Sequence, residues 1–455
     1  MSKEVKFFLL LFGDLAILFF SLWATLRLRF GDVRTEIWES HVIPFGILFF
    51  IWVTVFFIAG LYDPKKAQRG LGYWAQIVTV MFWNAAIAVI FFYLLSIPRL
   101  VSIRPFRVLA IEVGLATIFL LPWRDIMQRI FTARALATNL LLLGDTPLAR
   151  ETATYVKQHP SLGYQLVGIL QEGETKKSNP YSPREVPNDL ETFVREHDIR
   201  CIVSALDLHR DPELTKDLFR LFPARLRFQR LEEFYEDLTG KVPVTAIEEV
   251  WFLENMAETR KRLFEVAKRL FDIVVAILGL LLTLLLGPII ALLVVLDSKG
   301  PIFYFQDRVG KNGRILRAVK FRSMIADAEK EGPQWATPDD PRITPVGKFL
   351  RKTRLNELPQ FWNVFKGEMS LIGPRPERPW FVKDLQEEIP FYNERHLVKP
   401  GLTGWAQVNF RYGASKEDAL EKLQYDLFYI KNRSFVLELS ILLKTIKTII
   451  SGAGW

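Results

Sequence analysis

The sequence contains few of the residues that build covalent cross-links and metal clusters. Its 455 residues include one cysteine, Cys201, and five scattered histidines. A single cysteine excludes an intramolecular disulfide and a cysteine-built zinc site, and the histidines lack the spacing of metal ligands. No recognised nucleic-acid-binding motif or lysine-rich stripe is present. Disulfide scaffolds, cysteine-type zinc proteins and motif-bearing nucleic-acid binders are therefore set aside.

Apolar and aromatic residues, by contrast, are abundant. Half of the residues are hydrophobic, and the chain has 36 Phe and 12 Trp. This composition excludes a disordered or collagen-like chain, and the aromatic content is typical of proteins that contact membranes. The formal net charge of +9 indicates anionic partners. On charge alone these could be phospholipid head groups, phosphorylated substrates or nucleic acid.

Four apolar segments near the N-terminus are candidates for membrane spans. Phe7–Leu26, Val42–Leu61 and Trp74–Leu95 are each long enough to cover roughly 30 Å as a helix, and Val108–Pro122 is shorter. We expect that the first segment is not a signal peptide, because no small-residue cleavage site follows it. The distribution of Lys and Arg slightly favours a cytoplasmic N-terminus. We therefore expect a four-helix transmembrane domain over residues 1–123.

Two acidic residues, Asp14 and Glu112, lie inside these apolar segments. An acid within a membrane is a candidate for function by default. A contact between packed helices, or a shallow position near one membrane face, is the simpler explanation. We expect this simpler explanation to hold for both residues.

The middle of the chain has the pattern of an α/β domain. Leu140–Leu143, Tyr164–Leu170 and Ile199–Ser204 are short apolar runs separated by helical stretches. Strands that alternate with helices favour a parallel sheet. We expect a Rossmann-like α/β domain over residues 138–240.

This domain lacks the dinucleotide-binding fingerprint G-x-G-x-x-G/A. The corresponding stretch runs from Gly144 to Ala149, where Thr146 replaces a glycine and Pro147 removes a backbone donor near the helix start. The missing glycine is the one that lets the backbone approach a pyrophosphate. We therefore expect a regulatory or assembly domain, and not an NAD site.

A fifth apolar run, Ile273–Leu296, contains Pro288. A straight helix of this length reaches roughly 36 Å and could span a bilayer. Proline lacks an N–H group and clashes with the preceding turn, so the helix should kink or break there. Periodicity leaves two topologies open. A kinked span would put the middle domain and the C-terminal third on opposite faces, whereas a helix that re-emerges would keep them together.

Residues 300–455 contain no further spanning run and carry cationic side chains beside turn-forming residues. Arg375 lies between two prolines, Lys320 and Arg322 follow an apparent strand, and Arg354 shortly precedes an Asn-Glu pair. Guanidinium groups fixed in this way suit the oxygens of a phosphate. We expect these four residues to bind substrate phosphates. For any one of them, a solvated surface position is the alternative.

The run from about Arg262 to the C-terminus resembles the bacterial sugar transferase family, the polyprenyl-phosphate hexose-1-phosphate transferases. The apolar N-terminal segments and the α/β middle also resemble the large members of that family, which start exopolysaccharide, capsule or O-antigen assembly. The matching stretches are Lys268 to Asp272, Gly300 to Phe303, Gln306 to Gly310, Lys320 to Met324, Glu357 to Gln360, Met369 to Pro376 and Lys399 to Gln407.

The resemblance implies a reaction and a location. The family transfers a sugar-1-phosphate from a UDP-sugar to undecaprenyl phosphate, a polyprenyl phosphate, and releases UMP; it requires Mg²⁺. It implies a mixed, mainly α-helical catalytic domain over residues 262–455, with a re-entrant membrane helix at 266–297 that is broken at Pro288. This domain would lie on the cytoplasmic face of the bacterial inner membrane. The implied partners are the two substrates, membrane lipid and a second copy of the chain in a homodimer, but not nucleic acid.

The resemblance also identifies a departure at the centre of the site. In the family, the Asp of an Asp-Glu pair attacks phosphorus to form a covalent phospho-sugar intermediate, and the Glu helps to hold Mg²⁺. Glu357 matches the Glu, but Asn356 stands at the Asp position. An amide nitrogen is uncharged and delocalised, so it is a poor nucleophile, and Asn is a weaker Mg²⁺ ligand than a carboxylate.

Several interpretations of Asn356 are open. The chain could be a natural variant in which the lipid phosphate attacks directly or Glu357 is the nucleophile. It could be an inactive family member that acts as an assembly scaffold, or Asn356 could be deamidated. A nucleotide-sugar redox or epimerase enzyme centred on the middle domain is a separate alternative. The sequence does not identify the sugar.

Two further features concern the C-terminal helices. Asp426 matches an acid of the family, and both catalysis and a role on a helix surface are open for it. In the tail, Ser434–Ser451, apolar residues have helical spacing, with Lys444 and Lys447 between them. This amphipathic pattern predicts a helix on the membrane surface, with a core helix as the alternative.

Overall fold

The computed structural model divides the chain into two compact units, Met1–Phe234 and Tyr235–Trp455. The finer division into three domains stays a prediction. Leu95 and Ser451, at the ends of two predicted helices, lie outside the described residues. The structure describes residues 3–63, 71–94, 106–133, 137–171, 184–185, 190–206, 212–224, 226–256, 262–330, 332, 334, 340–410, 413 and 415–450.

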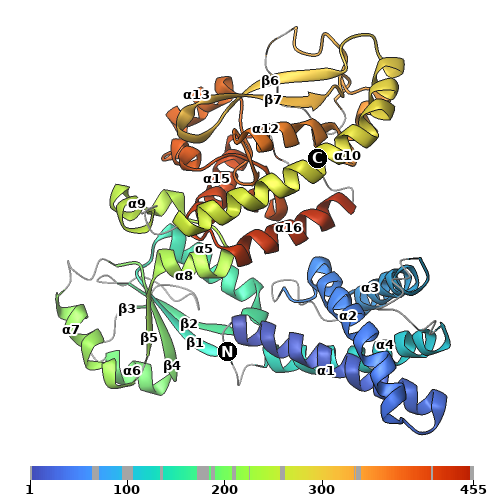
Figure 1. Cartoon of the computed structure of the whole chain (residues 1–455). Helices are drawn as coiled ribbons and strands as arrows, with labels where there is room; N and C mark the ends of the chain where they lie inside the picture. The colour runs from blue at the N-terminus through green and yellow to red at the C-terminus, as the bar shows by residue number, and fades with distance from the viewer. Residues whose placement is uncertain are drawn as a thin grey trace. The chain divides into compact units, whose positions relative to one another are not determined.

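The N-terminal part of the first unit is helical (Figure 1). Within the described residues, four of its helices are long and apolar enough to cross a membrane, and α10 of the second unit is a fifth. The four helices of the first unit pack around a core that includes Leu18, Phe45 and Trp52. Each of the four predicted segments coincides with a helix, although the second runs to Leu61, past the end of α2 at Ala59, and the last helix continues past Pro122. The helices are α1 (Lys3–Phe30), α2 (Thr35–Ala59), α3 (Leu71–Val89, continued by a π-helical turn at Ile90–Leu94) and α4 (Phe106–Thr132).

The two acids in these helices make helix-packing contacts, as predicted. Asp14 accepts hydrogen bonds from Tyr62 Oη at 2.7 Å and from Arg124 Nε at 3.0 Å. Glu112 accepts from two hydroxyl groups of α1, those of Ser21 at 2.6 Å and Thr25 at 3.0 Å. Because a buried charge is costly unless it is paired, these contacts fix α1 against α4.

The rest of the first unit contains a five-stranded parallel sheet with the order β3-β2-β1-β4-β5. The three predicted strands are present, and the leucines of β1 are buried. Thr146 caps the helix after β1 by accepting from the Ala149 N–H at 3.1 Å. The elements are β1 (Thr138–Leu143), α5 (Pro147–Gln158), β2 (Tyr164–Gln171), β3 (Arg184–Glu185), α6 (Leu190–Glu196), β4 (Ile199–Ser204), α7 (Pro212–Arg220), β5 (Arg227–Arg230) and α8 (Leu231–Thr239), which crosses into the second unit.

The second unit is mainly helical and contains two small sheets. β6 (Phe303–Val309) pairs antiparallel with β7 (Ile315–Phe321), and β8 (Ser370–Ile372) pairs parallel with β9 (Gly401–Thr403). A 3-10 segment, η9 (Leu355–Gln360), contacts β7. The helices are α9 (Glu249–Asn255), α10 (Arg262–Asp297), α11 (Pro345–Lys352), α12 (Phe361–Lys366), α13 (Pro379–Glu388), α14 (Trp405–Asn409), α15 (Lys416–Lys431) and α16 (Phe435–Ile450).

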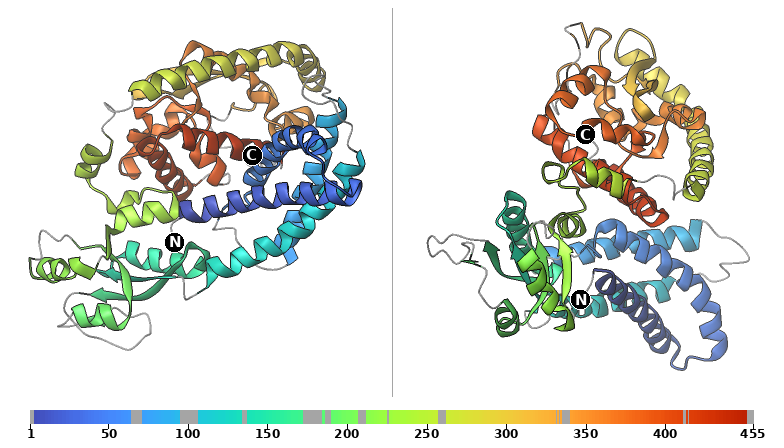
Figure 2. Two further views of the ribbon diagram at one scale, coloured as in Figure 1. Left: turned by 60° about the horizontal axis from the view of Figure 1, so that its bottom comes forward. Right: turned by 90° about the vertical axis from the view of Figure 1, so that its left-hand side faces the viewer.

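The long helix α10 is continuous across Pro288, where the sequence predicted a kink or a break and the family resemblance implied a break. Proline removes one backbone donor and crowds the preceding turn. The helix continues on both sides of Pro288. It therefore bends in its C-terminal part and does not end at the proline (Figures 1 and 2). The break implied by the resemblance is therefore wrong, whereas a bend agrees with the kink that proline predicted.

Helix α10 contacts the rest of the second unit near its start, in its middle and at its end. Near its start, the Lys268 ammonium donates to Glu438 at 2.6 Å. In its middle, a Cβ added at Gly279 would lie 2.4 Å from the ring of Phe361. At its last residue, Asp297 accepts from the Val346 N–H at 3.1 Å. The opposite face is exposed and apolar, and includes Leu281, Leu284, Leu285, Ile289 and Leu292.

The C-terminal helix α16 has one packed face and one exposed face. Ile441 is fully buried in the core of the second unit, and Thr445 exchanges a hydrogen bond with Thr403. Phe435, Val436 and Leu439 are exposed. The helix is therefore amphipathic, as predicted, and its contact with a membrane surface stays a prediction.

Candidate active site

A pocket of about 300 Å³ in the second unit brings the predicted side chains together. It is lined by β6, β7, η9 and the turn that follows β8. Pro288 is not among the lining residues. The predicted residues that line it are Lys320, Arg322, Arg354, Asn356, Glu357 and Arg375.

Local backbone features place the Asn-Glu pair in this pocket. Arg354 has a φ of 60°, a left-handed conformation that is uncommon for a residue with a side chain. This conformation ends the preceding turn, and η9 begins at the next residue. The Glu357 N–H then donates to the Arg354 carbonyl at 3.0 Å, which holds the two side chains on the same turn.

The turn that carries Arg375 is fixed from two sides. Backbone bonds run from the Gly373 N–H to Thr403 and from the Gly401 N–H to Pro374, both at 2.9 Å. The buried Arg395 donates to the Arg375 carbonyl at 3.0 Å and to Asp426 at 2.8 Å. Sequence reasoning missed Arg395, because nothing near it in the sequence indicates this contact.

Asp426 lies in the core of the second unit, with only 1% of its surface exposed. A position on a helix surface is therefore wrong for this residue. Burial raises the pKa of Asp426 to about 6, against the opposing effect of Arg395. Through Arg395, the residue helps to fix the Arg375 turn; a direct catalytic role stays untested.

Three cations converge on the carboxylate of Glu357. It accepts from Arg375 Nη2 at 2.8 Å, from Arg354 Nη1 at 3.2 Å and from Lys320 Nζ at 3.3 Å. Burial by itself raises the pKa of Glu357, but these three cations outweigh it and hold the pKa well below its usual value. The carboxylate is therefore ionised at neutral pH, and the positive charges around it are in excess.

Lys320 is the titratable member of this group. Burial lowers the pKa of Lys320 to about 7; Glu357 opposes the shift, and Arg375 and Arg308 add to it. Near neutral pH its side chain therefore interconverts readily between the charged ammonium and the neutral amine. An arriving anion would favour the charged form.

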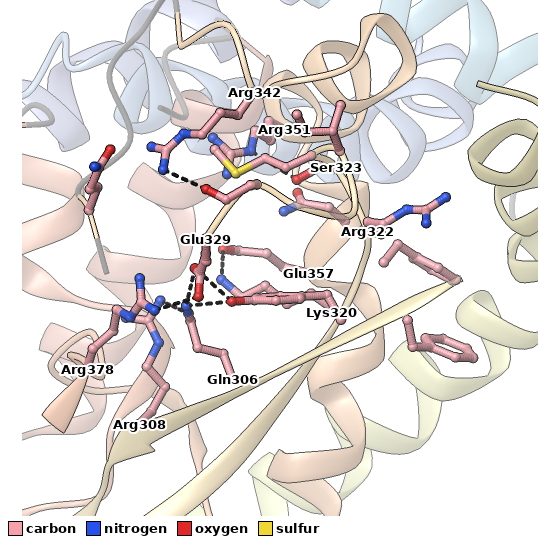
Figure 3. A pocket seen from close by; sticks show the side chains of 18 of the residues that line it. Gln306, Arg308, Lys320, Arg322, Ser323, Glu329, Arg342, Arg351, Glu357 and Arg378 are labelled. Atoms are coloured by element: carbon pink, nitrogen blue, oxygen red, sulfur yellow. Dashed lines mark hydrogen bonds and ion pairs between the residues drawn. The ribbon is translucent and has the colours of Figure 1, made fainter. Parts of the chain in front are cut away.

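Arg322 has a different environment. Its guanidinium donates to the carbonyls of Ser298 at 2.5 Å and Lys299 at 3.0 Å, just beyond the end of α10. It also donates to Val294, within the last turn, at 3.3 Å. Figure 3 shows the side chain pointing away from Glu357. These contacts cap α10 and tie the pocket to the apolar helix, and a phosphate-binding role for Arg322 stays a prediction.

Asn356 is buried beside Glu357, with 7% of its surface exposed. Its Oδ1 atom has no hydrogen-bond partner among the described residues. An unsatisfied buried acceptor is costly, so this atom is available to a ligand or to an ion.

The fit of Mg²⁺ can be judged from these two residues. No cluster of three or more His, Cys, Asp or Glu side chains is placed to hold a metal within the described part of the chain. Mg²⁺, however, is commonly held by one or two protein oxygens together with substrate phosphates. The Glu357 carboxylate and the unpartnered Asn356 Oδ1 fit a site of that shared kind.

Comparison with known proteins identifies the family of this chain. Residues 263–452 match the family model for bacterial sugar transferases. An uncharacterized sugar transferase of Bacillus subtilis is 39% identical over 35% of this chain and 75% of its own length. This chain belongs to the bacterial sugar transferase family.

Two longer matches have more specific names. A UDP-N-acetylgalactosamine-undecaprenyl-phosphate N-acetylgalactosaminephosphotransferase of Aeromonas hydrophila is 42% identical over 54% of this chain and 58% of its own length. A UDP-glucose:undecaprenyl-phosphate glucose-1-phosphate transferase of Escherichia coli is 33% identical over 67% of this chain and 66% of its own length. The chain thus spans less than two thirds of each of these relatives.

Proposed function

We propose that this chain is a phosphoglycosyl transferase that moves a sugar-1-phosphate from a UDP-sugar to undecaprenyl phosphate and releases UMP. This reaction would prime exopolysaccharide, capsule or O-antigen synthesis. The observation that supports it best is the convergence of three cations on the partly buried carboxylate of Glu357. The names of the two longer relatives contain a UDP-sugar and undecaprenyl phosphate.

The reaction brings two anions together, so the site must neutralise charge and align the reacting groups. Arg375, Lys320 and Arg354 carry more positive charge than Glu357 balances. A diphosphate entering the pocket could take over part of their hydrogen bonding from Glu357. Mg²⁺ bound by Glu357 and Asn356 Oδ1 would supply further neutralisation of the phosphate charge.

Direct attack by the lipid phosphate is the mechanism that the residues favour. An oxygen of that phosphate would attack the phosphorus that carries the sugar, and the bond to the bridging oxygen would break, so that UMP leaves with the bonding electrons. The Asn356 amide is a poor nucleophile. The lone pairs of Glu357 are held by three cations, which disfavours this carboxylate as the attacking group.

The proposed location follows from the contacts of α10. Both ends of this helix, at Lys268 and at Asp297, bond to the same unit. This favours a re-entrant helix that stays on one face of the membrane over one that crosses it. We place α10 in the cytoplasmic leaflet of the bacterial inner membrane, with α1 to α4 as four spans. A Rossmann-like middle domain and a homodimer complete the proposal.

The amide at position 356 also favours a second candidate, an inactive family member that acts as an assembly scaffold. One experiment separates the two. Membranes containing the wild type or Asn356→Asp are supplied with a panel of UDP-sugars, undecaprenyl phosphate and Mg²⁺, and UMP release is measured. Peptide mass spectrometry of residue 356 reports any deamidation in the wild type.

We expect the wild type to release UMP without trapping a protein-bound sugar phosphate, and Asn356→Asp to trap one. Chelation of Mg²⁺ should stop release by both proteins. Release by Asn356→Asp alone would support the scaffold. Release by neither protein, from any sugar of the panel, would refute the transferase.

A further inference from the structure

A second polar cluster lines the same pocket beside the cations around Glu357 (Figure 3). The alternation of side chains along β6 turns Tyr304, Gln306 and Arg308 to one face. Tyr304 Oη donates to Glu329 Oε1 at 2.8 Å, and Arg378 Nη2 donates to Glu329 Oε2 at 2.8 Å. Sequence reasoning missed Tyr304 and Glu329, although the alternation of β6 could have indicated the first.

The charges of this second cluster balance, unlike those around Glu357. Glu329 pairs with Arg378, and Arg308 lies 3.7 Å from Glu377. One part of the pocket therefore attracts an anion, and the neighbouring part offers hydrogen bonds without an excess of charge. A ligand that joins an anionic group to a neutral polar group matches this division.

The two clusters adjoin each other along the β6–β7 hairpin. Tyr304 is paired with Lys320 across the hairpin, and opposite residues of such a pair have Cβ atoms about 5 Å apart. Gln306 lies two residues further along β6, roughly 7 Å away. A group bound here must therefore be attached directly to the phosphate. In a UDP-sugar, the hexose and the ribose each meet that condition, whereas the base is separated from the phosphate by the ribose.

Glu329 keeps the capacity to accept bonds from a ligand. A carboxylate has about four acceptor positions, and Tyr304, Arg378 and, at 3.4 Å, Gln306 occupy part of this capacity. The Glu329 side chain is 38% exposed, so solvent or a ligand can reach it. Neighbouring hydroxyl groups of a sugar ring are donors of the kind that this carboxylate can bind.

We propose that Glu329, held by Tyr304 and Arg378, binds the vicinal hydroxyl groups of a sugar ring that is attached directly to a phosphate of the donor. This inference rests on the proposed function, because it assigns part of the UDP-sugar to particular side chains. The ring is the hexose or the ribose, which offer the same chemistry. The experiment below distinguishes them.

Calorimetric binding to the full chain in detergent, with Mg²⁺ present, tests the inference without requiring turnover. The ligands are UDP-glucose, UDP-N-acetylgalactosamine, UMP, 2′-deoxy-UMP and pyrophosphate. Glu329→Gln keeps the shape of the side chain and removes its charge. The matched control is Glu388→Gln, because Glu388 is exposed, pairs with Lys416 and does not line the pocket.

We expect Glu329→Gln to weaken binding of the better UDP-sugar about tenfold and to leave pyrophosphate binding unchanged. Glu388→Gln should change neither. If UMP binding is unchanged, the ring is the hexose. If UMP binding weakens but 2′-deoxy-UMP binding does not, the ring is the ribose. Tyr304→Phe, which removes one hydroxyl group, should give the same ligand pattern with a smaller loss, and it decides the matter if Glu329→Gln does not fold.

Three results would overturn the inference. They are an equal loss of pyrophosphate binding, a parallel loss for UMP and 2′-deoxy-UMP, and no change for any ligand. A wild type that binds UDP-sugars with the expected pattern but transfers nothing would refute the proposed function and leave this inference standing. If the wild type transfers sugar phosphate and Glu329→Gln binds every ligand as the wild type does, the inference alone is refuted. A wild type that binds no UDP-sugar would refute both the inference and the proposed function.

Discussion

Two carboxylates differ in the number of their cationic partners: Asp14, which is buried in the first unit, and Glu357, which is partly buried in the second. Asp14 pairs with Arg124, and Tyr62 donates a further hydrogen bond to it. Glu357 is contacted by Lys320, Arg354 and Arg375. The charges of Asp14 and Arg124 balance, whereas the three cations around Glu357 leave an excess of positive charge.

The difference separates a structural contact from a candidate binding site. A balanced buried pair has little use for a further ion, because a third charge would have to be buried without a partner. An excess of cations beside a pocket favours an incoming anion. The balance of charge around a buried acid is therefore more informative than its presence in an apolar sequence.

The largest expected effect is on stability, at the balanced pair. Arg124→Leu would leave the Asp14 charge buried and unpaired, which costs about 3–5 kcal/mol. Unfolding of the protein in detergent measures this loss. The double variant Asp14→Leu/Arg124→Leu should recover most of the stability, and an equally unstable double variant would contradict the comparison.

The next largest effect is on activity, at the unbalanced site. Arg375→Ala removes a fixed guanidinium from the pocket, and we expect kcat/KM for UMP release to fall on the order of a hundredfold. Its control is Arg150→Ala, because Arg150 is an exposed residue that pairs with Asp145 in the first unit. If Arg375→Ala also lowered the melting temperature enough for the protein to be unfolded in the assay, the loss of activity would reflect a loss of folding and not the proposed role.

The smallest effect is on the pH dependence of binding. Because the pKa of Lys320 is about 7, its ammonium is charged below that pH and neutral above it. Binding of an anionic diphosphate favours the charged form, so affinity should fall as pH rises, by about tenfold between pH 6 and pH 8. UDP-glucose binding in the presence of EDTA measures this without a contribution from a metal ion.

Lys320→Arg is the matched variant for this measurement, since arginine stays charged throughout the range. Its affinity for UDP-glucose should vary little between pH 6 and pH 8. A wild type with an equally flat profile would show that Lys320 does not titrate beside the ligand.

The sequence predicted elements more reliably than partners. The apolar helices and the three predicted strands of the parallel sheet are present because local periodicity determines them, whereas β3 and β5 were not predicted. The extension of α4 to Thr132 was not predicted, because Arg124 is stabilised by Asp14, which lies 110 positions away in the sequence. Residues that are distant in sequence but paired in space leave no local pattern.

The candidate site shows the same limit. The motif resemblance identified residues that line one pocket with Glu357. It did not indicate where each side chain points. Arg322 lies only two residues beyond Lys320 and directly follows β7, yet its guanidinium caps α10. Pro288 likewise predicted a disturbance of α10, but whether the helix bends or ends depends on the contacts around it.

The packing of α10 has a practical consequence for preparing this protein. Ala276, near the middle of this helix, is fully buried, and Gly279 lies against an aromatic ring of the same unit. The same helix, α10, thus carries an exposed apolar face and supports the interior of the unit that contains the pocket. Trimming it to obtain a water-soluble fragment would open the interior of the unit, so we expect a bilayer or a detergent belt to be needed for the pocket to keep its shape.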